Sequence, residues 1–394
     1  MCSSQTIDPE WAQPDAFASR HSIAVAQHLR GQIEDAGGVL PFDQYMDIAL
    51  YAPGLGYYAT GTRKFGQGGD FVTAPEIGPL FGRCLTREVG LVLETIDDAC
   101  LLEFGAGSGA LAQSLIEALS ADGRLPSRYC ILEISPDLRE RQRQRLEPLA
   151  EHHGLKIEWL EQLPDEPLQG VILANEVVDA FAVTRFRVIE GRPWRAGIGI
   201  DGDGFAWEWI DDLDPDSGAA KIVQQYELVE GYISEVCPRA EAWIHALGVS
   251  LQRGLALVID YGFPAREYYL PERSQGTLRC HYQHRAHNDP LILPGIQDVT
   301  CHVNFSALAE AGRTAGFDVL GYTSQESYLL ALGLLDLATP QPDDDEKLMF
   351  ARAAEVKQLI LPSQMGEAFK VMAFGKNIEQ VLAGFKLRDR SSSL

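Results

Sequence analysis

The sequence of 394 residues lacks the usual marks of an oxidising or membrane environment. Its seven cysteines are odd in number and scattered, and no two form a C-x-x-C pair, so they are predicted to be reduced thiols. No apolar run approaches the ~20 residues that a membrane helix needs. The start, MCSSQTIDPEW, has neither the apolar core of a signal peptide nor an arginine-rich amphipathic stretch. We therefore expect a globular, cytoplasmic protein.

Positive charge is also scarce. The 33 lysines and arginines face 56 aspartates and glutamates, which gives a formal net charge of −23 at pH 7. A surface of this sign repels phosphate and argues against general nucleic-acid binding. A small cationic ligand or a basic protein segment suits this charge better.

The first hundred residues predict helices on either side of a long loop. Val25, Leu29 and Ile33 stand four apart within 22–36, and a second amphipathic pattern covers 42–50. Residues 52–79 are dense in glycine, proline and aromatic residues and have no helical or strand period. Long loops of this kind inside compact proteins are usually functional or disordered, and the aromatics argue against disorder. Another helix is expected through 81–92.

The rest of the chain alternates buried strands with helices. Apolar runs at 100–104, 129–134, 155–160, 170–175 and 255–262 are separated by turns or helical patterns, which is typical of an α/β, doubly wound parallel sheet. Residues 184–247 break this rhythm and predict antiparallel hairpins with turns at 190–191 and 201–204. Two last strands are expected at 317–323 and 369–376, with helices between them.

A glycine-rich turn follows the first of these strands. In LLEFGAGSG, Gly105, Gly107 and Gly109 followed by Ala110 fit G-x-G-x-x-A, the spacing of a loop that brings its backbone against a ligand. That spacing fits a dinucleotide and S-adenosylmethionine equally well. Glu103 would favour the ammonium group of S-adenosylmethionine, and Glu133 is placed to accept hydrogen bonds from both ribose hydroxyls. A tight turn without a ligand is the alternative.

Several segments together resemble one family. LLEFGAGSG, ILEISPDLRERQRQRL and ILANEVVDAF, with YMDIALYAPGLGYYA and GDFVTAPEIGPLFG before them, are similar to the MidA-type class I methyltransferases, over about 44–376. Ala182 stands where that family usually has proline. The family includes the mitochondrial complex I assembly factor that methylates an arginine. The resemblance implies a Rossmann-like sheet of seven strands with the last one antiparallel, and S-adenosylmethionine as the cofactor.

The resemblance also implies which residues form the site. The catalytic candidates are Asn175, Glu176 and Asp179 of ANEVVDAF, at the carboxyl end of the fourth strand. The expected cofactor-binding residues are Glu103, Gly105, Ala106, Gly107, Gly109, Glu133, Ile134 and Asn175. Thr73, Pro75 and Glu76, with Phe71, belong to a loop that the resemblance sets against the cofactor. A purely structural loop is the alternative for this last group.

Methyl transfer explains why carboxylates stand at this strand end. The displacement needs neither a metal nor a protein nucleophile, so positioning supplies most of the rate. A guanidinium remains charged at neutral pH, and the site must orient it and accept a proton late. Glu176 and Asp179 suit that task. The alternative for Glu176 is a charge favoured by a helix N-terminus, and Asp260 could equally be a helix or turn cap.

A histidine-rich segment offers a metal-site alternative. His281, His284 and His287 stand three apart beside Cys280, and Cys301 and His302 follow later. No paired cysteines exist, so we predict no metal and interpret the segment as a polar loop over the mouth of the site. The arginine-rich LRERQRQRL is predicted to be a solvated helix face.

We divide the chain into four segments. They are N-terminal helices and a Gly/Tyr-rich loop that pack on the core (1–97), the first half of a methyltransferase core (98–183), an inserted α+β region (184–250) and the second half of the core with a loop insertion at about 263–304 (251–394).

Three functions stay open. The first is methylation of an arginine in a protein partner, linked to assembly of a respiratory complex. The others are a non-catalytic, cofactor-binding assembly factor and an NAD-dependent oxidoreductase. A homodimer is one form that we expect of the chain.

Overall fold

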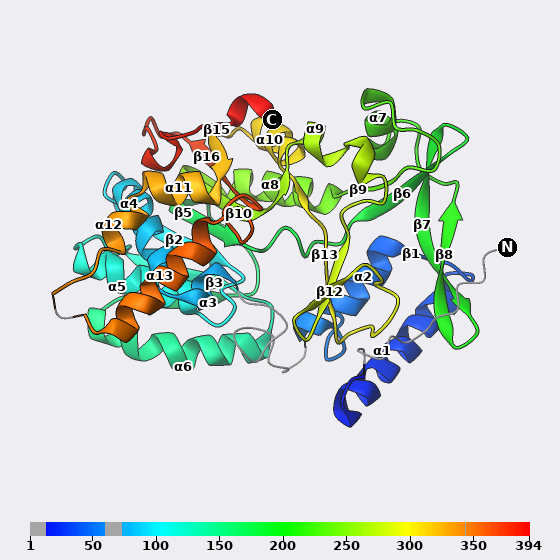
Figure 1. The fold of residues 1–394 in the computed structure, drawn as a ribbon, viewed down its shortest axis with the longest axis horizontal. Coiled ribbons are helices and arrows are strands. Elements are labelled where there is room, and N and C mark those ends of the chain that lie inside the picture. Colours follow the sequence, from blue (N-terminus) through cyan, green and yellow to red (C-terminus); the bar gives the residue numbers. More distant parts are fainter. Residues whose placement is uncertain (1–12, 60–72, 343) are drawn as a thin grey trace.

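A mixed sheet forms the centre of the chain in the computed structural model, which describes residues 13–59, 73–342 and 344–394 (Figure 1). Its strand order is β15-β16-β10-β5-β2-β3-β4, and a short strand, β14, pairs with the end of β10. β16 is antiparallel to both of its neighbours, while β10, β5, β2, β3 and β4 are parallel. The predicted seven-stranded arrangement with an antiparallel last strand is therefore confirmed. The strands are β2 (Cys100–Phe104), β3 (Arg128–Leu132), β4 (Lys156–Leu160), β5 (Leu168–Asn175), β10 (Leu251–Phe263), β14 (Val303–Asn304), β15 (Asp318–Ser324) and β16 (Phe369–Lys376).

Helices cover both faces of this sheet, because side chains alternate along each strand. Leu101 packs into one apolar cluster and its neighbour Leu102 into another. The first cluster includes residues of α4 (Leu80–Leu93), α5 (Ala110–Ala121), α6 (Pro136–His153), α11 (Gln325–Ala331), α12 (Leu334–Leu337) and α13 (Glu346–Ile360). The second includes residues of α8 (Pro238–Ser250) and α10 (Phe305–Thr314). The sheet is thus buried on both sides, as the continuous apolar runs indicate.

The inserted α+β region forms a second sheet beside the core, drawn in green at the right of Figure 1. Ile189 pairs with Arg192 and Asp201 with Gly204, so both hairpin turns lie where the sequence predicts them. The elements are β1 (Leu40–Pro41), β6 (Thr184–Ile189), β7 (Arg192–Asp201), β8 (Gly204–Ile210), α7 (Gly218–Gln225) and β9 (Ile233–Val236).

The N-terminal helices α1 (Ala16–Asp35) and α2 (Phe42–Tyr51) pack against this second sheet, because Val25, Leu29 and Phe42 share a cluster with Ala196 and Ile198 of β7. α1 begins six residues before the predicted start at 22, since the carboxylate of Asp15 accepts hydrogen bonds from two backbone amides of its first turn. The predicted loop at 52–79 contains two short elements, the 3₁₀ turn η1 (Tyr57–Ala59) and α3 (Ala74–Ile77). Its residues 60–72, Phe71 among them, lie outside the described part of the chain.

The 263–304 insertion, predicted as a loop, contains regular structure. It has α9 (Ala265–Tyr268), the 3₁₀ turn η2 (Pro271–Arg273) and a three-stranded antiparallel sheet of β11 (Arg279–Tyr282), β12 (Arg285–His287) and β13 (Asp298–Thr300). The strands are only three or four residues long and mostly polar, so the sequence has no alternation to reveal them. Their hairpin turns at Gln283 and His284, both with positive φ. The chain ends in two 3₁₀ turns, η3 (Ala383–Phe385) and η4 (Ser391–Ser393).

A search of the described residues for a membrane-spanning helix finds none of sufficient length and hydropathy.

Candidate active site

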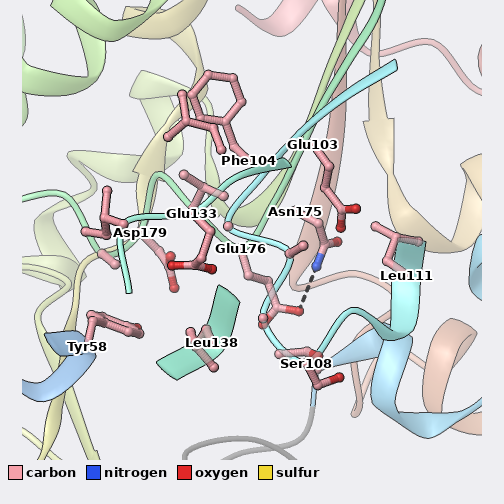
Figure 2. Close-up of a pocket in the computed structure, with 18 of the residues that line it drawn as sticks. Tyr58, Glu103, Phe104, Ser108, Leu111, Glu133, Leu138, Asn175, Glu176 and Asp179 are labelled. Atoms are coloured by element: carbon pink, nitrogen blue, oxygen red, sulfur yellow. Dashed lines mark hydrogen bonds between the residues drawn. The ribbon is translucent and has the colours of Figure 1, made fainter. Parts of the chain in front are cut away.

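A cavity of about 380 Å³ lies where β2, β3 and β5 end, at the carboxyl edge of the parallel strands. Most of the predicted site residues line it. These are Thr73, Pro75, Glu76, Glu103, Gly105, Ala106, Gly107, Glu133, Ile134, Asn175, Glu176 and Asp179. The four segments that carry them are far apart in sequence, and Figure 2 shows several of their side chains around the same space.

The glycine loop at the end of β2 needs glycine for its backbone as well as for ligand access. Gly105, Gly107 and Gly109 all have positive φ, at 58°, 54° and 81°. Side-chain-bearing residues rarely adopt this conformation. Gly109 does not line the cavity; it is the N-cap residue of α5. Its conformation aims the first turn of α5 at the cavity, because Ala110 and Leu111 line it.

Glu103 is a buried carboxylate inside β2. It is 2% exposed and accepts a hydrogen bond of 2.6 Å from the hydroxyl of Tyr129 on β3. Burial raises the pKa of Glu103 to about 7, although the Tyr129 hydrogen bond opposes this and Glu133 adds to it. A ligand ammonium would favour the ionised form and replace the solvation that burial removes.

Glu133 directly follows β3, which ends at Leu132 and thus before the predicted strand end. Its Oε1 accepts from the amide of Ser135 at 2.9 Å, and its Oε2 accepts from Gln142 Nε2 at 3.1 Å. The Gln142 amide also donates to the carbonyl of Gly107 at 2.9 Å, so it ties Glu133 to the glycine loop. Ile134, beside Glu133, is 56% exposed and offers an apolar surface to a ligand ring.

The sequence predicts that the arginine-rich segment of α6 is a solvated helix face, but two of its side chains contact the site. Gln142 is fully buried, and Arg145 donates a 2.8 Å hydrogen bond to the hydroxyl of Ser108 in the glycine loop. Ser108 in turn donates to Glu76 of α3. The signal that the sequence does offer is spacing, since Leu138, Gln142 and Leu146 stand four apart on one side of α6 and are all buried.

The segment after β5 makes a strained turn at Glu176. Glu176 has a φ of 54°, and its amide donates to the carbonyl of Ile259 on β10 at 2.9 Å. The side-chain amide of Asn175 donates to Glu176 Oε1 at 3.2 Å, the dashed line of Figure 2. A non-glycine residue in this conformation costs about 1–3 kcal/mol and is held only by its surroundings. Strain of this kind is common where a side chain must point into a functional site.

Asp260 holds the next turn in place. Its carboxylate accepts hydrogen bonds from the amides of Val178 at 3.0 Å and Asp179 at 3.2 Å, and from Tyr261 at 2.9 Å. The sequence left open a helix cap or a turn cap, and the structure gives a turn cap, because no helix follows Asp179 directly. Asp260 thus positions the turn that carries Asp179 without lining the cavity.

Glu176 and Asp179 have different electrostatic environments. Burial raises the pKa of Glu176 to about 8, and the nearby Asp179 carboxylate adds to that rise. Burial also raises the pKa of Asp179, to about 6, but a hydrogen bond from the Tyr261 hydroxyl opposes it. Glu176 is therefore the stronger base of the two. A cation between them would lower both pKa values and hold the carboxylates ionised.

The far half of the cavity comes from parts of the chain that sequence reasoning did not assign to the site. Its residues are Asp47 and Tyr51 of α2, Tyr58 of η1, Arg239 and Trp243 of α8, Asp298 of β13, and Phe181. The rings of Tyr51 and Tyr58 stack at 5.5 Å, and Arg239 pairs with Asp47 at the half-exposed edge. The Gly/Tyr-rich stretch was a usable signal for the two tyrosines. The sequence has none for Arg239 or Asp298.

The histidine-rich segment does not line the cavity, although His281 pairs with Asp298 of the cavity wall. His281 is on β11, His287 is on β12, and His284 is at the turn between them. His302 stacks on Phe263 at 5.1 Å. A search of residues 13–59, 73–342 and 344–394 for three or more grouped metal-ligating side chains finds none.

The cavity has the features that S-adenosylmethionine requires. Glu103 can bind an ammonium, the glycine loop leaves backbone exposed, and Glu133 stands at the end of the neighbouring strand where a ribose would lie. Asn175 Oδ1 is buried and has no hydrogen-bond partner among the described residues, so it is an acceptor that a ligand could satisfy.

Comparison with known proteins agrees with the cofactor that the cavity suits. Residues 84–323 match the family model described as "Putative S-adenosyl-L-methionine-dependent methyltransferase". A structure from Burkholderia thailandensis bound to S-adenosyl-homocysteine is 42% identical, with a TM-score of 0.92, and the match covers 97% of this chain and 99% of that one. A native structure from the same organism is 41% identical, with a TM-score of 0.88 and the same coverage.

Curated relatives match nearly the whole chain. The mouse protein named "Protein arginine methyltransferase NDUFAF7, mitochondrial" is 30% identical over 90% of this chain and 85% of its own length. The homologue in Drosophila melanogaster is 28% identical, with coverages of 93% and 89%. The human protein is 28% identical, with coverages of 88% and 82%.

Proposed function

We propose that this chain, which belongs to the family of S-adenosyl-L-methionine-dependent methyltransferases, methylates the guanidinium of an arginine in a partner protein. The protein is a class I methyltransferase, and S-adenosylmethionine is its cofactor. We therefore interpret the glycine loop as a binding loop for S-adenosylmethionine and not for a dinucleotide. The acceptor is the part that we propose.

The carrying observation is a pair of carboxylates beside the cofactor half of the cavity, the half-buried Glu176 and the buried Asp179. Glu176 and Asp179 line the same space as the glycine loop, and each carboxyl has a raised pKa. Buried carboxylates are costly unless a cation or hydrogen bonds compensate them. A guanidinium remains positive at neutral pH and supplies that compensation through a planar fork of donors. The names of the curated relatives, protein arginine methyltransferases, support the same acceptor.

The residues then divide the work of the reaction. The cofactor would supply an activated methyl group. A guanidinium nitrogen would attack its carbon, so that the N–C bond forms as the S–C bond breaks and neutral S-adenosyl-homocysteine leaves with the electron pair. Glu176 and Asp179 orient the nitrogen, and a proton leaves the methylated guanidinium. Glu176 is the better acceptor for that proton, because its carboxylate is the more basic. Asn175 keeps Glu176 aimed into the cavity.

We further propose that the acceptor protein is a subunit of a respiratory complex and that methylation accompanies its assembly. The support is the resemblance of this chain to the family that contains a complex I assembly factor. The net charge of −23 also favours a basic segment as the docking partner. A cytoplasmic location stays a prediction.

The test is a methylation assay with purified protein, methyl-labelled S-adenosylmethionine and an extract of cells that lack this protein. The expected result is a labelled respiratory-complex subunit whose label maps to arginine by mass spectrometry. Glu176→Gln should lose the label, while Glu151→Gln, the same change at an exposed position of α6, should keep it. A label on lysine or on a carboxylate would overturn the arginine proposal. Stable capture of the subunit without any label would favour the assembly-factor alternative.

A further inference from the structure

Asp298 is the one buried carboxylate that the 263–304 insertion brings to the cavity wall. It is 3% exposed and begins β13, where it pairs with His281 of β11. The hydroxyl of Tyr58 donates a 2.9 Å hydrogen bond to its Oδ1. Asp298 thus joins the insertion to η1 of the N-terminal segment at the wall of the cavity.

Two further contacts fix Asp298 relative to the candidate catalytic turn. Three residues on, the amide of Cys301 donates to the backbone carbonyl of Asp179 at 2.9 Å. The hydroxyl of Tyr51, whose ring stacks on Tyr58, donates to the carbonyl of Ala180 at 2.9 Å. The turn that carries Asp179 is therefore attached to β13 directly and to Tyr58 through Tyr51. The negative charge of Asp298 also raises the pKa of Glu176, as expected for carboxylates on the same cavity.

We propose that Asp298 is a specificity-determining residue of the acceptor site, where its carboxylate accepts hydrogen bonds from the substrate guanidinium together with Glu176 and Asp179, which line the same cavity. This inference rests on the proposed function, because it assumes that the acceptor is a guanidinium. A guanidinium presents donors on two edges of a plane. Carboxylates from the core and from the insertion can bind those two edges at the same time, which one carboxylate cannot do.

The Tyr51 and Tyr58 pair supports the same arrangement. Tyrosine rings favour a cation against their faces, and a flat guanidinium stacks on such a ring more readily than an ammonium does. The result is a slot with aromatic and acidic walls that selects a planar cation.

The experiment compares arginine with citrulline, which has nearly the same shape but no charge. An acetylated Gly-Gly-Arg-Gly-Gly amide and its citrulline counterpart are titrated into protein saturated with S-adenosyl-homocysteine. The wild-type protein should bind the arginine peptide at least tenfold more tightly. Asp298→Asn keeps the size of the side chain but removes its charge, so that preference should fall to within about threefold, as expected for the loss of a charge-assisted contact. Affinity for S-adenosyl-homocysteine should not change.

The matched control is Asp289→Asn, the same substitution at an exposed position of the same insertion. Asp289 accepts a hydrogen bond from the amide of Leu291, which an asparagine oxygen can also accept, and it does not line the cavity. This variant should keep the wild-type preference. If the Asp298→Asn protein fails to bind S-adenosyl-homocysteine, the Tyr58→Phe variant is used in its place. That substitution removes only the hydroxyl that orients Asp298. It should reduce the preference severalfold.

The outcomes separate this inference from the proposed function. An Asp298→Asn or Tyr58→Phe protein that binds S-adenosyl-homocysteine and keeps the full preference for arginine overturns the role of Asp298. A wild-type protein with no preference for arginine over citrulline overturns it as well. If the preference depends on Asp298 but no arginine is methylated in the cell extract, the acceptor slot stands and the proposed reaction fails.

Discussion

Replacing Glu176 by glutamine should weaken catalysis and stabilise the fold at the same time. Burial raises the pKa of Glu176 from its usual 4.5 to about 8, so the folded protein disfavours the ionised form. The contribution of Glu176 to the free energy of unfolding is therefore fully present below pH 4.5 and is lost as the pH rises toward 8. Glutamine is neutral at every pH and does not impose this cost.

The size of the effect follows from the two pKa values. One pKa unit corresponds to 1.36 kcal/mol, so at pH 7 the 2.5 units above the usual value of 4.5 give an upper limit of about 3 kcal/mol. Relaxation around a real cavity reduces this figure. We expect the Glu176→Gln protein to unfold a few degrees above the wild type at pH 8 and at the same temperature at pH 5. Thermal unfolding at both pH values measures this.

Catalysis should change in the opposite direction. Methyl transfer should fall by a hundredfold or more, because orientation of the guanidinium and acceptance of its proton both depend on the carboxylate. S-adenosyl-homocysteine should still bind, since Glu103, Glu133 and the glycine loop are unchanged. Asp179→Asn is measured beside it, with the exposed Glu151→Gln as the control.

Two results would refute this reasoning. A Glu176→Gln protein with the same gain in unfolding temperature at pH 5 and pH 8 would show that Glu176 does not titrate between them. A variant that methylates at the wild-type rate would remove Glu176 from the chemistry and leave the methyltransferase itself in place.

Three more predictions concern the cofactor. Glu133→Ala should weaken S-adenosyl-homocysteine binding at least tenfold in calorimetry, because two charge-assisted hydrogen bonds to a ribose are worth about 1.5–3 kcal/mol each; unchanged affinity would mean that the ribose lies elsewhere. Gly107→Val places a branched residue at a φ of 54°, so affinity should fall while circular dichroism remains native, and a folded variant of normal affinity would contradict the site. Because the pKa of Glu103 is about 7 and its ionised form binds the ammonium, affinity should rise from pH 6 to pH 8 in the wild type and stay flat in Glu103→Gln; parallel profiles would exclude Glu103 from that contact.

The core of the fold could be predicted because its signals are local. The apolar run at 100–104 predicts a strand, and the glycines after it predict a turn that leads into a helix, all within about twenty residues. The hairpins at 190–191 and 201–204 are equally local, since their glycines set the turn. Short polar strands such as β12 could not be predicted from the sequence, because only pairing with β11 defines the strand.

The cofactor half of the site was also predictable, because parallel strands bring their carboxyl ends to one edge of a sheet. That rule alone brings Glu103, Glu133 and Glu176 together. It does not find Gln142, which was assigned to a solvated helix face. The four-residue spacing of Leu138, Gln142 and Leu146 was a signal within α6, but whether a polar side chain on that side is buried depends on the element against which the helix packs.

The acceptor half was decided only by tertiary structure. Tyr58, Arg239 and Asp298 reach the cavity from an N-terminal turn, an inserted helix and an inserted strand. Tyr58 and Asp298 are 240 residues apart and meet through one hydrogen bond. The sequence by itself determined the core strands, the loops that follow their carboxyl ends and the cofactor that these loops suit. Each of these depends on residues that are close together in the sequence. The enclosure of the acceptor depends on how two insertions pack against the core, and such long-range contacts leave no period, motif or spacing in the sequence.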